Sequence, residues 1–351
     1  MRAGSVLTEA WRDVVTGTAR SSVLALVLAL GVGVLGVVDA RAVVDVLRDA
    51  EEYRASGAAT WVVQDDGGVD GFRCDALDGV AGMRAGALRQ AEPLRALAMP
   101  SSQITTWEVT PGLLDVALGR TDRRASGVWV SADLADTLGV RAGDVLATAQ
   151  GEATVAGTYV WPDDGRARVL GYAVLAPVTA TGSFDACWAA TWPPDGDTAG
   201  LLYATTRPGA EPTFGQLNAR LGATFDGGSR LDARVTRWAP AAAVLLGLAV
   251  GWAGARARRL QVASAMHARV PRAHLAWQHL VEAAVWVGAA ALVATAATGW
   301  AAAAGNPDPT HTVWLGALRV VGAGAGAALL GTLAGVLTTR ERHLFRYFKD
   351  R

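Results

Sequence analysis

The hydrophobic pattern of this chain is dominated by four long apolar runs that contain no charged side chain. They are Ser21–Val38, Trp238–Ala255, Ala283–Asn306 and Val320–Thr339. A membrane-spanning helix needs about 20 consecutive, mostly apolar residues. Each run is therefore predicted to form a helix that crosses a bilayer, one near the N-terminus and three in the last third of the chain.

Short apolar and polar stretches alternate between the first and second runs. Strands are expected at Ala59–Gln64, Val80–Leu88, Leu201–Thr206 and Leu231–Val235, and helices at Phe72–Leu77 and Thr213–Leu221. Further short strands, broken by Gly and Pro, are expected at Val128–Val130, Val145–Ala149, Glu152–Val160 and Ala173–Leu175. This pattern predicts paired β-α-β layers around a β-rich insert at about 117–180.

The predicted fold class is a membrane protein with an α-helical domain of four spans in a one-plus-three order, and an α+β domain inserted between spans one and two. The expected segments are a cytoplasmic amphipathic helix at 1–20, transmembrane helix 1 at 21–40, the inserted domain at 41–236, transmembrane helix 2 at 237–257, a cytoplasmic loop at 258–279, transmembrane helix 3 at 280–304, an outer loop at 305–312, transmembrane helix 4 at 313–339 and a tail at 340–351.

The first twenty residues contain one apolar stripe, formed by Leu7, Trp11, Val14 and Val15. Such a helix fits a position flat on the inner membrane surface, and it also fits an ordinary amphipathic helix without a special role. The run that follows has no small-x-small cleavage site. It is therefore expected to be a retained anchor.

Charge is distributed unevenly, although the whole chain is formally neutral. Segment 39–237 holds 26 acidic residues and 18 arginines, a formal charge of −8. The segments 2–20, 256–272 and 340–351 hold the other basic residues apart from Arg319, and the loop at 305–312 holds none. The positive-inside rule then places both termini in the cytoplasm and the inserted domain outside. Arg319 is expected to extend toward the outer interface.

The expected location is therefore the cell membrane, as a multi-pass protein. Lys349 is the only lysine, and this bias toward arginine is typical of a GC-rich bacterium. No basic surface for nucleic acid is predicted.

Both cysteines, Cys74 and Cys187, fall in the predicted outer domain. An oxidising exterior permits a disulfide between them. Two buried free thiols are the alternative, because a sequence does not supply the geometry that a disulfide requires.

Glycines recur inside the predicted spans at spacings that suit close helix packing: Gly31, Gly33, Gly36, Gly322, Gly326, Gly331 and Gly335. The first three fit G-x-G-x-x-G, but a dinucleotide site needs a strand before the motif and a polar turn. Small residues that allow helices to approach closely explain the motif better here. The last four form two G-x-x-x-G pairs, which predict contacts within the chain or between subunits.

The sequence predicts a non-catalytic chain that binds no metal or cofactor. An ATPase phosphate-binding loop needs Gly-Lys-Ser/Thr, and Lys349 follows Phe348. The histidines and cysteines show no ligand spacing, and there is no G-x-S-x-G sequence. Glu282 stands at the edge of the third span, near Arg272 and His279. An interfacial ion pair and a proton or ion path are both open for it.

Three stretches and the order of the parts resemble one transporter family. They are Arg20–Gly33 at the entry to the first span, Gly127–Leu146 with Ala153–Tyr159 in the outer domain, and Arg258–Glu282 between the second and third spans. Together they make the chain similar, over essentially its whole length, to the permease subunits of MacB/FtsX-like ABC transporters. The resemblance implies a second permease, as a homodimer or heterodimer, and a separate ABC ATPase that binds ATP and magnesium.

Two functions follow from this resemblance. The first is a permease that exports or extracts a peptide, an antibiotic or a lipid-linked substrate, in contact with membrane lipid. The second is an FtsX-like mechanical transmitter that regulates a cell-wall hydrolase, an extracytoplasmic partner protein, without transport. The β-rich insert favours the MacB-like branch.

The same resemblance implies which residues meet the ATPase: Arg258, Arg259, Gln261, Val262, Ala263, Met266 and Arg272. Val262 and Met266 are four residues apart, share a helix face, and are expected to fill an apolar groove on the ATPase. The family usually has an acidic residue where Gln261 stands and a glycine where Arg269 stands. These departures leave open a third function, a membrane scaffold that has lost ATPase coupling.

The arginine asymmetry generates a testable topology. Single cysteines, introduced with the native pair blocked, are expected to react with an impermeant thiol reagent from outside at positions in 100–125 and 305–309. Positions in 256–272 and 340–351 are expected to stay unlabelled until the membrane is opened. Labelling of 256–272 in intact cells would overturn this orientation.

Overall fold

The computed structural model describes residues 20–119, 126–194, 198–209 and 211–349. The helix expected at 1–20 lies outside this part of the chain except for Arg20. The chain divides into two compact units, a helical unit formed by Met1–Asp49 with Asp226–Arg351 and a sheet unit formed by Ala50–Phe225.

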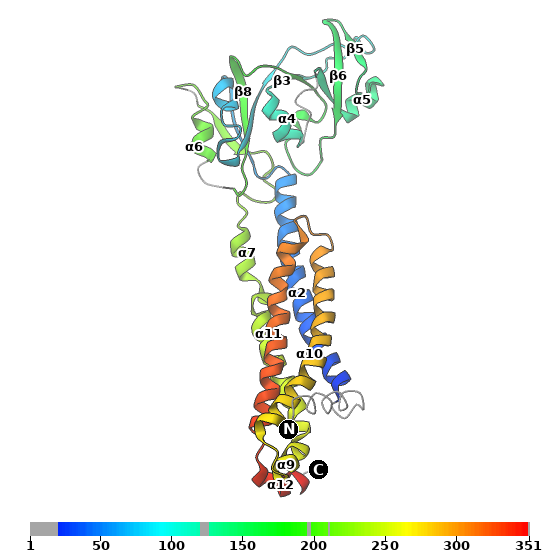
Figure 1. The fold of residues 1–351 in the computed structure, drawn as a ribbon. Helices are drawn as coiled ribbons and strands as arrows, with labels where there is room; N and C mark the ends of the chain where they lie inside the picture. Colours follow the sequence, from blue (N-terminus) through cyan, green and yellow to red (C-terminus); the bar gives the residue numbers. More distant parts are fainter. Residues whose placement is uncertain (1–19, 120–125, 195–197, 210, 350–351) are drawn as a thin grey trace. The chain divides into compact units, whose positions relative to one another are not determined.

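The helical unit is a bundle of long apolar helices that lie alongside one another (Figure 1). Its main helices are α2 (Ser21–Ala55), α8 (Ala239–Ala257), α10 (Arg272–Ala303) and α11 (Thr310–Leu337). Within the described residues, four helical segments are long and apolar enough to cross a membrane. Shorter elements complete the unit: α7 (Gly227–Ala233), the 3-10 turns η3 (Val235–Trp238) and η4 (Glu341–His343), α9 (Arg259–His267) and α12 (Leu344–Lys349).

Glycines let the backbones of α8 and α11 approach each other. A Cβ on Gly251 would meet the backbone of Ala328, and a Cβ on Gly331 would meet the backbone of Leu248. In lipid there is little hydrophobic drive between helices, so close van der Waals packing of small residues provides much of the association. The contact between α8 and α11 therefore depends on residues without side chains.

The predicted packing glycines fall into two groups. Those that face a neighbouring helix are Gly31 (Leu246), Gly33 (Ala294), Gly36 (Thr298), Gly331 (Leu248) and Gly335 (Ala255). Gly322 and Gly326 are exposed, and a Cβ on either would meet nothing within 4 Å. The Gly331/Gly335 pair thus packs inside the chain, whereas the Gly322/Gly326 pair lies on an outward face of α11.

The sheet unit is built on one mixed sheet, with the strand order β5-β6-β4-β7-β3-β2-β8-β1-β9 in its described part. Neighbours are antiparallel except β3 with β7 and β4 with β6, which are parallel. The strands are β1 (Thr60–Asp70), β2 (Arg84–Gln90), β3 (Thr106–Val109), β4 (Val128–Ser131), β5 (Val145–Thr148), β6 (Gly151–Tyr159), β7 (Val174–Pro177), β8 (Ser183–Ala190) and β9 (Thr213–Gln216).

Short helices accompany the sheet: α3 (Gly71–Asp75), η1 (Val80–Gly82), α4 (Pro111–Leu118), α5 (Ala132–Leu138), η2 (Arg168–Leu170) and α6 (Thr198–Tyr203). Strands β4 to β7 belong to the same sheet as the others. The expected β-rich segment therefore extends one sheet and does not separate two layers, so the prediction of paired β-α-β layers is wrong.

Three further predictions, all between residues 201 and 235, are wrong for identifiable reasons. Thr213–Leu221 was predicted to be helical, but Thr213–Gln216 pairs with the edge of β1 and Phe214 stacks on Trp61 at 4.9 Å. Leu231–Val235 was predicted to be a strand. Instead Asp226, whose side chain accepts a hydrogen bond from the Ser229 N–H at 2.9 Å, caps helix α7.

The third is Leu201–Thr206, which was expected to be a strand. Its first three residues instead form the end of helix α6, where Leu202 is fully buried. In these segments the local pattern suited either a helix or a strand. Tertiary packing, and in α7 the capping side chain of Asp226, decided between them.

Gly331 and Gly326 allow a matched test, because both lie on α11. Gly331→Ala is expected to lower the free energy of unfolding by about 1–3 kcal/mol, since the new methyl group would overpack against the α8 backbone. Gly326→Ala is expected to be neutral or slightly stabilising, because its methyl group meets open space and alanine favours helix. Thermal unfolding of the purified chain in detergent measures both. Equal effects would contradict the packing described here.

Candidate functional site

The junction of α8, α9 and α10 contains the residues that the sequence predicted to contact an ATPase. Arg258 is the boundary residue, since it follows the last residue of α8 and precedes the first residue of α9. Helix α9 then ends in a turn in which the Val270 N–H donates to Ala265 O at 3.1 Å. Arg269 in this turn has a φ of +62°. Glycine suits this left-handed conformation best, so Arg269 adopts a backbone conformation that side chains rarely take.

Arg258 and Glu282 form a buried ion pair at this junction. Their side chains are 14% and 4% exposed. The His279 Nδ1 atom lies 3.2 Å from Glu282 Oε2, and Gln278 donates to Glu282 Oε1 at 3.3 Å. The structure thus gives Glu282 an ion pair with Arg258, and the expected neighbour Arg272 lies exposed at the start of α10.

A cavity of about 20 Å³ adjoins the ion pair and is lined by Arg258, His279, Glu282, Trp286 and Thr332, with other residues. This volume suits about one water molecule. Three ionisable side chains therefore border a small polar space between helices that are otherwise apolar. Among the described residues, no group of three or more His, Cys, Asp or Glu side chains is placed to hold a metal ion.

The apolar face of α9 is covered by the chain itself. Val262, Ala263 and Met266 are buried in a cluster that includes Val336 of α11 and Tyr347 of α12. Val262 and Met266, which the sequence assigned to a groove on an ATPase, thus pack against the bundle of their own chain.

The other predicted coupling residues lie around this buried face. The Arg259 guanidinium lies 5.2 Å from the centre of the Tyr347 ring, and Gln261 accepts a hydrogen bond from Arg258 Nε at 2.8 Å. Gln261, Ser264 and Arg272 are exposed. The surface that α9 offers to a partner is thus its polar side.

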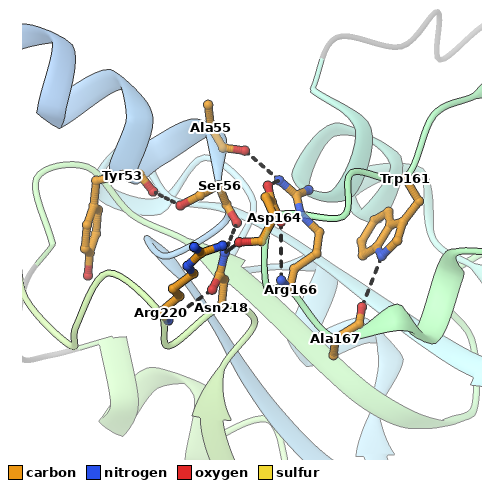
Figure 2. A network of polar contacts seen from close by, with 9 residues as sticks. All are labelled: Tyr53, Ala55, Ser56, Trp161, Asp164, Arg166, Ala167, Asn218 and Arg220. Atoms are coloured by element: carbon orange, nitrogen blue, oxygen red, sulfur yellow. Dashed lines mark hydrogen bonds and ion pairs between the residues drawn. The ribbon is translucent and has the colours of Figure 1, made fainter.

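A second polar network holds the last turn of α2 inside the sheet unit (Figure 2). Arg166 Nη2 donates to Ala55 O at 2.6 Å, where a cation satisfies a carbonyl at the negative end of the helix. The guanidinium also donates twice to the Asp164 carboxylate, at 3.0 and 2.8 Å. Its charge lies 5.1 Å from the centre of the Trp161 ring. Arg166 is only 8% exposed.

Asn218 extends this network from the segment that follows β9. Its Nδ2 atom donates to Ser56 O at 3.0 Å and to Asp164 O at 3.3 Å, and its Oδ1 accepts from the Arg220 N–H at 3.0 Å (Figure 2). Two loops far apart in sequence thus hold the end of α2. Sequence reasoning missed this network because Asp-Asp-Gly-Arg resembles an ordinary solvated turn.

Cys74 and Cys187 form a disulfide that joins α3 to β8 across 113 residues of chain. Both are fully buried. In the chain-entropy model, a loop of about 100 residues gains about 4.7 kcal/mol from such a bond.

No protein-family model matches this chain, and no curated protein matches it. Among solved structures, a domain of a candidate permease protein from Porphyromonas gingivalis is similar, with 15% identity and a TM-score of 0.32. The match covers 49% of this chain and 94% of that one.

Arg166 and Arg168 provide a matched pair in one loop. Arg166→Ala is expected to destabilise the sheet unit by about 2 kcal/mol, because it leaves a helix-end carbonyl and a carboxylate without their buried donor. Arg168→Ala is expected to have little effect, since Arg168 and its partner Asp163 are 77% and 79% exposed. Urea unfolding of the full chain in detergent, followed by tryptophan fluorescence, measures both. A loss for Arg168→Ala as large as that for Arg166→Ala would contradict this assignment.

The same network predicts a pH dependence. Hydrogen bonds donated by Arg166 lower the pKa of Asp164 below its ordinary value. A carboxyl group whose pKa is lower in the folded state stabilises the fold above its unfolded pKa, and this contribution is lost as the pH falls through the folded pKa. The stability difference between the unchanged chain and Asp164→Asn is therefore expected to be full near pH 7 and to shrink below about pH 4. A difference that stays constant down to pH 2 would contradict this.

Proposed function

We propose that this chain is the permease subunit of an ABC transporter and that a separate ATPase subunit, with its ATP and magnesium, drives it. The observation that carries the proposal is helix α9. It is a short helix between two candidate spans, its apolar face is fixed to its own bundle, and its polar face is exposed. A helix held in this way can receive a force from a partner and pass it to the spans.

The exposed side of the junction suits a partner with acidic groups. Ser264, Arg269 and Arg272 are exposed there, beside His267, whose Nδ1 atom lies 3.0 Å from Glu341 Oε1. The adjoining tail is also rich in arginine. A docking surface made of charged and polar groups favours a regulated contact between subunits, because electrostatic complementarity gives specificity and speed of association. The resembled transporter family usually has an acidic residue at position 261 and a glycine at position 269. Gln261 and Arg269 therefore make this surface more positive than is usual in that family.

Two further features support a transporter of the MacB-like kind. Strands β4 to β7 give the sheet unit an extension that a shorter transmitter does not need. The exposed Gly322/Gly326 pair on α11 offers a close-packing surface to a second permease or to lipid. We therefore propose a substrate that the outer domain meets at the outside of the cell membrane: a peptide, an antibiotic or a lipid-linked molecule.

The test is purification of the full tagged chain from its native membrane, identification of co-purifying proteins by mass spectrometry, and measurement of ATP hydrolysis. An ABC ATPase is expected to co-purify. Ser264→Glu combined with Arg272→Glu is expected to weaken its recovery at least about tenfold, since like charges would face an acidic surface. Arg168→Glu, a charge reversal at an exposed residue of the sheet unit, serves as the control.

Purified chain without any ABC ATPase, under conditions that keep the membrane complex intact, would contradict the proposal. Recovery of the ATPase together with a cell-wall hydrolase, and no transported substrate, would instead favour the mechanical transmitter.

A further inference from the structure

Arg258 contacts three helices from one position. It ends α8 and begins α9, its Nε donates to Gln261 in the first turn of α9, and its Nη1 pairs with Glu282 of α10. The same Nη1 lies 3.5 Å from His279 Nδ1. This one guanidinium therefore links the start of α9 to α10.

The cost of burial makes this contact selective. Removing one partner of a buried ion pair strands the other charge away from water, which is strongly destabilising. Glu282 is 3% exposed overall, and apolar groups such as Ala283 and Trp286 lie beside it. The junction is therefore stable with both charges present and paired, and unstable with either one alone.

The residue at position 261 fits this arrangement. Gln261 is neutral and accepts a hydrogen bond from Arg258 Nε, while the Nη1 side of the guanidinium faces Glu282. An acidic residue at 261 would compete with Glu282 for the same cation. The glutamine thus directs the charge of Arg258 inward, toward α10.

We infer that Arg258 and Glu282 are a positioning pair that holds α9 on α10, so that the two helices move as one body. This inference rests on the proposed function only for what drives the movement. Force delivered to the exposed face of α9 then passes through the ion pair into the third candidate span, in addition to the apolar cluster that contains Val262 and Met266.

The test uses hydrogen–deuterium exchange of the α9 amides in the full chain, reconstituted in lipid nanodiscs without a partner. Arg258→Glu and Glu282→Arg are each expected to speed exchange on the order of 100-fold, since each leaves like charges at a buried site. The double variant, which restores an ion pair with reversed direction, is expected to return exchange to within about tenfold of the unchanged chain. Arg168→Glu in the sheet unit is the control for a charge reversal at an exposed residue away from α9 in the chain.

Arg258→Gln and Glu282→Gln provide a second measurement if a single reversal does not accumulate in the membrane. In that case recovery of membrane insertion by the double reversal supports the pair. The inference is overturned if exchange is unchanged in both glutamine variants, or if the double reversal exchanges as fast as the single ones.

A co-purified complex separates this inference from the proposed function. In that complex, ATP is expected to change the distance between α10 and α11. Each single reversal is expected to abolish this change, and the double reversal is expected to restore it. Absence of an ATPase would remove the proposed function and leave the exchange result on the isolated chain intact.

Discussion

The close approach of the α8 and α11 backbones is the contact on which the helical unit depends. Gly251 and Gly331 make it feasible, because any side chain at either position would meet backbone atoms of the other helix. Backbone-to-backbone packing leaves little freedom for one helix to slide on the other. A bundle built in this way responds to force by moving whole helices, because close-packed interfaces change between discrete arrangements more readily than they deform.

Buried charge is placed where helices begin or end. Arg258 pairs with Glu282 at the start of α9, and Arg166 holds the last turn of α2 in the sheet unit. Both arginines are largely removed from water and both satisfy partners that would be costly to leave unpaired. Arg258 joins α9 to α10, whereas Arg166 joins a loop of the sheet unit to the last turn of α2, and losing either arginine would leave a buried partner unpaired.

The sequence predicted the parts whose pattern is long or strongly periodic. The apolar runs identified the candidate spans, and the alternating stretches near Val128 and Glu152 identified strands of the sheet. It failed for Thr213–Leu221, where pairing with β1 decides the structure. Short segments suit either helix or strand, and contacts with residues distant in sequence then determine the outcome.

The candidate site shows the same division. Arg258 and Glu282 were both singled out from the sequence, but for separate roles, because no pattern reveals that residues 24 positions apart face each other in a folded bundle. Val262 and Met266 were assigned to a partner, since an apolar stripe does not say which surface covers it. Asp164, Arg166 and Asn218 gave no signal at all, as their contact exists only in three dimensions.

In the proposed function, a separate ATPase moves α9 and, through it, the spans. Its most direct test is a pulsed electron-spin distance between labels at Ser264 on α9 and Leu315 on α11, both of which are exposed. In the native complex, the distance distribution is expected to shift when a non-hydrolysable ATP analogue and magnesium bind, and to return when they are removed. The isolated chain is expected to show no shift. Identical distributions with and without nucleotide in the complex, or a shift in the isolated chain, would contradict the account.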